Sequence, residues 1–186
     1  ASDVYKRQAL AWFNNLLNKV TETLNTQFDQ YRISEALMTI YTTFRDEFSS
    51  WLLEMIKPAY GQPIDRQSYE QTVCIFEQLL QLLHPFMPFI TEDIWQALRT
   101  RKDGESIMIS IMPQPAEYDE NLLSRFEAVK NVIVGIRNIR KQDNVPFKDA
   151  LELKVKVSER YPASFASIIC NCLLYTSPSP RDLSTS

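Results

Sequence analysis

Two prolines within a short apolar segment constrain the fold more than any other feature of the chain. The segment, residues 84–95, reads His-Pro-Phe-Met-Pro-Phe-Ile-Thr-Glu-Asp-Ile-Trp. Pro85 and Pro88 lack the backbone N–H that a helix interior requires, so the helix before them must end or bend there. Thr91, followed by two acidic residues, supplies an N-cap and charges suited to a helix N-terminus. We therefore predict that one helix ends before this turn and that another begins at Thr91.

Apolar residues recur at intervals of three and four in four longer segments, which is the spacing of one face of an amphipathic helix. Helices are predicted over residues 8–28, 33–57, 69–83 and 121–143, with a shorter one over residues 91–98 after the proline turn. Pro58 ends the second helix, and a loop follows to residue 65. Because the connections are short, neighbouring helices should run antiparallel. The predicted fold is therefore mainly α, an up-and-down antiparallel helical bundle.

A small α+β appendage is predicted after the bundle. A polar loop over residues 99–105 precedes a β-branched and apolar segment, residues 106–112, which predicts a short strand. Residues 151–157 alternate strictly between apolar and polar, which predicts a second strand after the last long helix. We therefore divide the domain into a helical bundle, residues 9–105, and an appendage that completes it, residues 106–169.

Both ends of the chain look foreign to this domain. Residues 2–8 and 173–182 resemble translated sequencing-adapter DNA, which contaminates the ends of some reading frames. We expect residues 1–8 to be a non-native head and residues 170–186 to be a disordered, adapter-like tail. The alternative for the tail is a natural Ser/Pro-rich segment, which would be disordered because of its composition.

Composition excludes several classes of function. With only three glycines, the chain cannot form the glycine-rich phosphate loop of a Rossmann or P-loop fold. A net charge of −3 argues against nonspecific coating of nucleic acid, so any RNA contact must be local. Three cysteines without a secretory signal, and the lack of an apolar run of about 20 residues, favour the cytoplasm over a membrane. Cys170 and Cys172, with one histidine in the whole chain, make a poor zinc site, so no metal site is predicted.

The proline turn is one of several motifs that follow one another in the order of a known family. They read YRISEAL at residues 31–37, DEFSSWLLEMIKP at 46–58, HPFMPFITEDIW at 84–95, ESIM at 105–108 and VIVGIRNIR at 132–140. This series resembles the anticodon-binding domain of valyl-tRNA synthetases and their class I relatives, over residues 9–169. Leu53 departs from the family, which usually has a tyrosine-containing pair near this position.

The resemblance implies a module that holds the anticodon stem and loop of tRNA(Val), while a separate catalytic domain of the parent chain activates and transfers valine. The parent enzyme would use ATP and Mg, and no cofactor is expected in this part of it. The catalytic motifs HxGH and KMSKS are missing, since the chain has one histidine and no Lys-Met-Ser-Lys-Ser sequence. No catalytic residue is therefore predicted, and the chain should be inactive alone. DNA and membranes are not expected partners.

Two alternatives remain at this point. The first is the same domain of an isoleucyl- or leucyl-tRNA synthetase, which the ESIM motif makes a poorer match. The second is a free-standing helical scaffold that binds protein partners through an exposed apolar groove, which the acidic pI would suit. The scaffold predicts an exposed apolar stripe, whereas an RNA-binding module predicts a continuous basic face.

Candidate RNA-binding residues are basic side chains that a helix or loop could present together, since phosphates attract cations and unstacked bases lie on aromatic or guanidinium planes. Near the end of the last long helix the spacing places three cations on one side, although cations also stabilise a helix C-terminus. A second basic cluster lies in the loop after residue 98, where a solvated turn is the simpler explanation. The candidates are Arg137, Arg140 and Lys141 in the helix, Arg99, Arg101 and Lys102 in the loop, and Arg32 and Lys57 at the ends of the second helix.

Three conspicuous side chains are assigned structural roles. Trp51 and Trp95 fall within helical apolar stripes, which predicts core packing rather than base stacking. His84 has no carboxylate or thiol at the spacing of a catalytic triad and precedes a proline, which predicts a structural or capping role.

Overall fold

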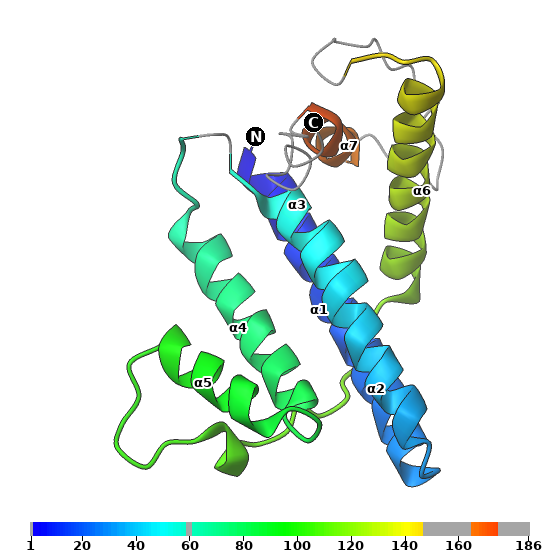
Figure 1. Cartoon of the computed structure of the whole chain (residues 1–186). Helices are drawn as coiled ribbons and strands as arrows, with labels where there is room; N and C mark the ends of the chain where they lie inside the picture. Colours follow the sequence, from blue (N-terminus) through cyan, green and yellow to red (C-terminus); the bar gives the residue numbers. More distant parts are fainter. Residues whose placement is uncertain (1, 59–60, 147–164, 175–186) are drawn as a thin grey trace, which may run out of the picture.

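Two long antiparallel helical rods form the centre of the molecule (Figure 1). The computed structural model describes residues 2–58, 61–146 and 165–174, and within these ranges it is helical apart from turns and loops. The first rod is α1, Ser2–Asp29. The second is made of α2, Ile33–Thr42, then η1, Thr43–Leu52, then α3, Leu53–Ile56.

The remaining helices lie around these rods (Figure 1). On one side, α4, Arg66–Leu83, packs on α1 and α2, and α5, Pro88–Leu98, turns back across the end of α4. On the other side, α6, Glu120–Gln142, packs on α1, and α7, Ala166–Leu174, lies between α6 and α3. The predicted up-and-down helical bundle is confirmed.

The middle of the second rod, η1, is a π-helix. The hydroxyls of Ser49 and Ser50 donate to the carbonyls of Phe44 and Arg45, five residues earlier, at 3.0 Å each. The N–H of Leu53 likewise donates to the carbonyl of Phe48. Such i to i−5 bonding widens the helix locally, and π-bulges of this kind frequently mark functional sites.

Aromatic rings join the helices in the core. Trp12 of α1 stacks on Phe126 of α6 with ring centroids 5.1 Å apart. Phe48 of η1 stands edge-on to Phe13 of α1 at 5.7 Å and stacks on Phe76 of α4 at 5.6 Å. Offset-stacked and edge-on pairs are the favourable ring geometries, so these contacts fix how the helices meet.

The second rod ends before Pro58, and a residue in the left-handed conformation, Tyr31, precedes its start. Lys57 leaves the helix with ψ of 125°, as expected of a residue that precedes a proline. At the other end, the turn between α1 and α2 places Tyr31 in the left-handed region with φ of 57°. A tyrosine in this conformation is strained, because its Cβ crowds the backbone where glycine has none.

The proline turn corrects the predicted start of α5. The helix begins at Pro88 rather than at Thr91, because a proline at the first helical position loses no hydrogen bond. Thr91 therefore lies one turn inside the helix, where it is fully buried. Its hydroxyl lies 2.7 Å from the carbonyl oxygen of Met87, 3.2 Å from that of Pro88 and 2.7 Å from Nδ1 of His84. The structural role predicted for His84 is confirmed.

Other boundaries also differ from the sequence predictions. The strand predicted over residues 106–112 is wrong: residues 107–109 form a short 3-10 helix, η2, Ile107–Ile109, and the flanking residues have no regular structure. The strand predicted over residues 151–157 lies outside the described residues. Helix α1 begins at residue 2, within the predicted head, and residues 170–174, which we expected to be disordered, belong to α7. In the part of the chain that the structure describes, no helix is long and apolar enough to cross a membrane.

The buried hydroxyl of Thr91 gives a stability prediction. Thr91→Val keeps the shape of the side chain but removes the buried hydroxyl that bonds to His84 and to the carbonyls of Met87 and Pro88, which should lower the free energy of unfolding by about 1–3 kcal/mol. Thr42→Val is the matched control, since the exposed hydroxyl of Thr42 donates to the carbonyls of Met38 and Thr39 in the same way. Urea unfolding of both variants checks the difference, and equal losses would contradict it.

The cap of α4 gives a pH prediction. Asp65 Oδ1 accepts the N–H of Ser68 at 2.8 Å, and this bond, more than any other contact, lowers the pKa of Asp65 to about 2. A lowered pKa in the folded chain means that the carboxylate stabilises the fold above its ordinary pKa of 3.8, and that this contribution is lost as pH falls toward 2. Asp65→Asn keeps a capping oxygen without the charge. We expect the native chain to exceed this variant in stability by about 0.5 kcal/mol at neutral pH, and the difference to vanish near pH 2. A difference that urea unfolding finds independent of pH would count against this assignment.

Candidate functional site

The three basic residues near the end of α6 do not share one exposed face. Arg137 points inward: its guanidinium lies 5.8 Å from the ring centre of Trp51, donates to the Cys172 carbonyl at 3.2 Å and approaches Glu54 at 3.7 Å. Arg140 is buried and donates to the Pro146 carbonyl at 3.1 Å. Lys141 is exposed.

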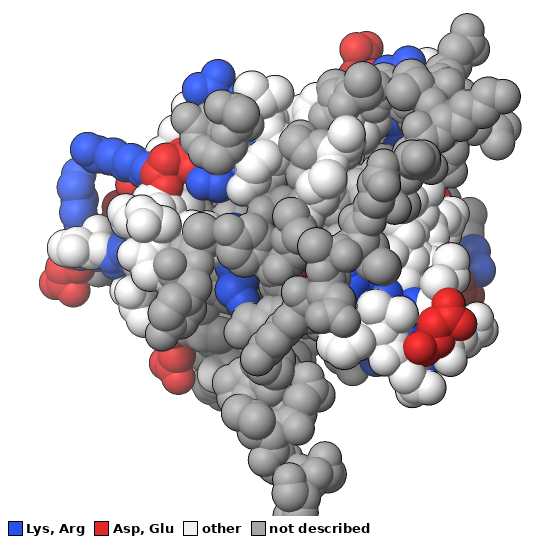
Figure 2. Space-filling model, turned by 90° about the horizontal axis from the view of Figure 1, so that it is seen from above, with Lys and Arg blue, Asp and Glu red and all other residues white. Residues whose placement is uncertain are grey.

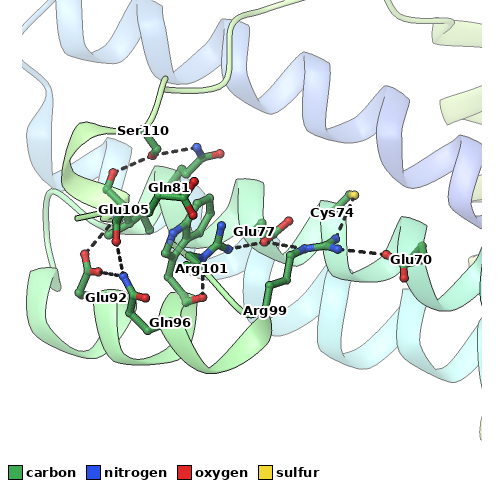
Figure 3. Close-up of polar contacts among 12 residues, drawn as sticks. Glu70, Cys74, Glu77, Gln81, Glu92, Gln96, Arg99, Arg101, Glu105 and Ser110 are labelled. Atoms are coloured by element: carbon green, nitrogen blue, oxygen red, sulfur yellow. Dashed lines mark hydrogen bonds and ion pairs between the residues drawn. The ribbon is translucent and has the colours of Figure 1, made fainter. Parts of the chain in front are cut away.

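The loop cluster after α5 is held by ion pairs with α4 (Figure 3). Oε1 of Glu77 accepts from Arg99 Nε at 3.0 Å and from Arg101 Nη2 at 2.5 Å. Arg99 also donates to Glu70 at 3.1 Å, and these carboxylates, Glu77 first, raise its pKa. The Arg101 guanidinium covers the ring of Trp95 at 3.8 Å, and its Nε donates to the Trp95 carbonyl. Trp95 is buried, as predicted.

A second network fixes the far end of the same loop. The Glu92 carboxylate accepts hydrogen bonds from Gln96 at 2.7 Å, from the Ser106 hydroxyl at 2.7 Å and from the Ile107 N–H at 3.1 Å. These bonds lower the pKa of Glu92, and the bond from Gln96 has the largest effect. Gln96 also donates to the Glu105 carbonyl at 2.6 Å (Figure 3). The loop is therefore clamped at both ends, and Lys102 lies exposed between the clamps.

The remaining two candidates are exposed and lie at opposite ends of the second rod. Arg32 pairs with Glu35, with Nε 2.8 Å from Oε1. Lys57 follows α3. Among the described residues, the structure records no ion pair for the ammonium groups of Lys57, Lys102 or Lys141.

No continuous basic face is visible where α3 and α6 end. In Figure 2, which looks onto this end of the molecule, basic groups of the described residues are separated by acidic and neutral ones. The net charge of −3 likewise favours an RNA contact through a few local groups.

The turn between α1 and α2 and the helical segment after it present aromatic and basic side chains, of which only Arg32 was a predicted candidate. We use the name hairpin tip for this turn and the helical segment that follows it, with the side chains Tyr31, Arg32, Tyr41 and Arg45. Tyr31 is 88% exposed, and the Arg45 guanidinium lies 5.1 Å from the ring centre of Tyr41. Arg45 also pairs with Asp46 at 2.7 Å, which lowers the pKa of that carboxyl. The spacing of Tyr41 and Arg45, four residues apart on a helix, was a signal for the second half of this surface.

The two ion pairs at the hairpin tip hold their arginine side chains only weakly. The Arg32–Glu35 and Arg45–Asp46 side chains are about half exposed, and exposed ion pairs contribute little to stability. A phosphate could therefore replace either carboxylate at small cost. Unstacked RNA bases bind to exposed aromatic rings, and guanidinium groups that can exchange a carboxylate for a phosphate bind the RNA backbone.

Residues 11–157 match the family described as the anticodon-binding domain of tRNA ligase, and the chain belongs to this family. The resemblance inferred from the motifs is thereby confirmed, and the family match favours this domain over a helical scaffold.

Relatives of the chain among curated proteins include valine–tRNA ligases. The chain is 52% identical to that of Parabacteroides distasonis over 166 residues, which are 89% of this chain and 19% of the relative. It is 51% identical to that of Phocaeicola vulgatus over 92% of this chain and 20% of the relative. The chain thus spans one fifth of the length of these ligases.

The shared carboxylate of Glu77 predicts an unequal response to two mutations. Glu77→Ala leaves Arg99 and the mostly buried Arg101 without their common acceptor, which should lower the free energy of unfolding by about 2 kcal/mol. Glu70→Ala removes one exposed pair with Arg99 and should cost less than about 1 kcal/mol. Thermal and urea unfolding compare the two, and a larger loss from Glu70→Ala would refute the clamp.

Proposed function

We propose that this chain recognises the anticodon stem and loop of tRNA(Val) for a valine–tRNA ligase. The observation that carries the proposal is the family match over residues 11–157 together with about half-identical valine–tRNA ligases. The ESIM motif and these relatives support valine over isoleucine or leucine as the amino acid of the parent enzyme.

In this proposal the chemistry belongs to other parts of the parent enzyme. A separate catalytic domain would use ATP and Mg to activate valine and would then transfer it to the tRNA in the cytoplasm. The present chain has one histidine and no KMSKS sequence, so it would bind RNA without catalysing aminoacylation. Binding the tRNA in a fixed orientation would still contribute to catalysis in the parent enzyme, because it makes the reaction of two molecules effectively unimolecular.

The hairpin tip is the proposed base-contacting surface. Its rings would stack on unpaired bases, and Arg32 and Arg45 would exchange their exposed carboxylate partners for phosphates. Lys57, Lys102 and Lys141 are proposed to add phosphate contacts, since their ammonium groups are free of ion pairs among the described residues. Arg99, Arg101, Arg137 and Arg140 would act indirectly, by fixing the loop and helix that carry the lysines.

Binding to RNA oligonucleotides tests the proposal directly. The chain should bind a fluorescent hairpin with the anticodon stem-loop sequence of tRNA(Val) more tightly than the same hairpin with its anticodon replaced, and the affinity should fall with salt. Fluorescence anisotropy at several salt concentrations measures both. Equal affinity for the two hairpins would contradict recognition of the anticodon.

Tyr31 allows a test in which stability and function change in opposite directions. Tyr31→Gly relieves the strained φ and should raise the free energy of unfolding by about 1 kcal/mol. The same change removes a stacking ring and should weaken binding of the anticodon hairpin about 5- to 150-fold, since one stacked base contributes about 1–3 kcal/mol.

Tyr69→Ala is the control, because Tyr69 is an exposed tyrosine on α4 and lies outside the hairpin tip. It should leave hairpin affinity unchanged. A Tyr31→Gly variant that is more stable and binds equally well would remove Tyr31 from the site.

A further inference from the structure

Six exposed apolar side chains gather where α5 meets η2. We call this surface the apolar face and define it by Met87, Phe89, Ile90, Met108, Ile109 and Ile111. Four of them are almost fully exposed, with Phe89 at 85%, Ile111 at 84%, Met108 at 75% and Ile109 at 73%. Single exposed apolar residues are ordinary, but a group of them on adjacent elements marks an interaction site.

The apolar face is held in place by the structure beneath it. Glu92 of α5 accepts from Ser106 and from the Ile107 N–H, which fixes the start of η2 against α5. Gln81 of α4 donates to the Ser110 hydroxyl and to the Ile111 carbonyl, both at 2.9 Å (Figure 3). Between these tethers, Ile107 is buried with Leu80 and Trp95. The segment is thus anchored by one apolar side chain while its other apolar side chains are held outward.

The apolar face also lacks charge. Residues 84–91 and 106–116, the two segments that carry it, contain no Asp, Glu, Lys or Arg. Surfaces that stay in water are normally rich in these residues, and interface centres are depleted of them. RNA is a poor occupant, because its phosphates need cations and neither of these two segments carries one.

We infer that the apolar face docks against an apolar surface of another domain of the same ligase polypeptide. The inference rests on the proposed function, because it takes the chain to be one domain of a valine–tRNA ligase. Its relatives have about four fifths of their length outside the matching segment, so protein surface is available to cover the face. Such docking would couple the position of the RNA-binding helices to the rest of the enzyme.

Thiol labelling tests whether the apolar face is covered. Met108→Cys and Ile111→Cys are introduced into the isolated chain, and into the Parabacteroides distasonis ligase whose matching segment has been exchanged for this chain. Met38→Cys on α2 is the control, since Met38 is exposed outside the face. Maleimide labelling rates are measured at each position by peptide mass spectrometry, with and without tRNA(Val).

If the face docks, the cysteines of Met108→Cys and Ile111→Cys should react at least tenfold more slowly in the exchanged ligase, the one that carries this chain, than in the isolated chain. This difference should appear without tRNA. The cysteine of Met38→Cys should react at similar rates in both proteins. Equal rates in a ligase that aminoacylates tRNA(Val) would overturn docking while leaving the proposed function intact. Protection that requires tRNA would assign the face to RNA. Protection in the isolated chain that grows with its concentration would assign it to a second copy.

A charge substitution gives a second, independent measurement. Ile111→Asp should leave the melting temperature of the isolated chain unchanged, because the side chain is exposed there, but should lower that of the exchanged ligase. Ile107→Asp is the matched contrast, since Ile107 is buried and its substitution should destabilise both proteins. An Ile111→Asp ligase that melts like its parent would also overturn the inference, whether or not it retains activity.

Discussion

The buried hydroxyl of Thr91 fixes the corner on which the α4–α5 side of the molecule depends. The Thr91 hydroxyl lies 2.7 Å from Nδ1 of His84 and 2.7 Å from the carbonyl oxygen of Met87, so it joins the C-cap of α4 to the start of α5. The corner sets the direction of α5 and so brings Glu92 to the start of η2 and Trp95 beneath Arg101. Both the clamped loop and the apolar face therefore follow from one hydrogen-bonded turn between two prolines.

Three arginines of this chain brace its tertiary structure. The guanidinium groups of Arg99, Arg101 and Arg137 bridge acids or carbonyls on other elements and cover tryptophan rings in two cases. A planar group with five donors suits bonding to several partners at once. Lys130 is buried too and pairs with Glu47 and Glu127, so internal support is not confined to arginine. Basic residues that are neighbours in the sequence are thus divided between internal support and the surface.

Helix positions could largely be predicted from the sequence, because they follow from apolar periodicity and from prolines such as Pro58. The start of α5 could not, since Thr91 has the residue type of an N-cap but its hydroxyl bonds inside the helix. The segment around Ile107 has strand-forming residues, yet its conformation is set by tertiary partners: the Glu92 carboxylate and the pocket formed by Leu80 and Trp95.

The candidate site was less predictable than the fold. The spacing of Arg137 and Arg140 predicted that they share one side of a helix. It could not predict that this side faces the core, because charged residues are normally on the surface. Tyr31 entered only as part of the YRISEAL motif, since a left-handed tyrosine cannot be distinguished from an ordinary one by its sequence context. Family motifs supplied the functional assignment that residue-level reasoning alone could not.

The π-helix in the second rod determines how the hairpin tip is rotated about its axis. One residue added to or removed from an α-helix turns everything beyond it by about 100°, since a full turn takes 3.6 residues. Because η1 lies between the anchored α3 and α2, the number of residues it accommodates sets which side of the rod Tyr41 of α2 presents. A change of one residue in the length of this segment would therefore redirect the tip without altering a single side chain on it.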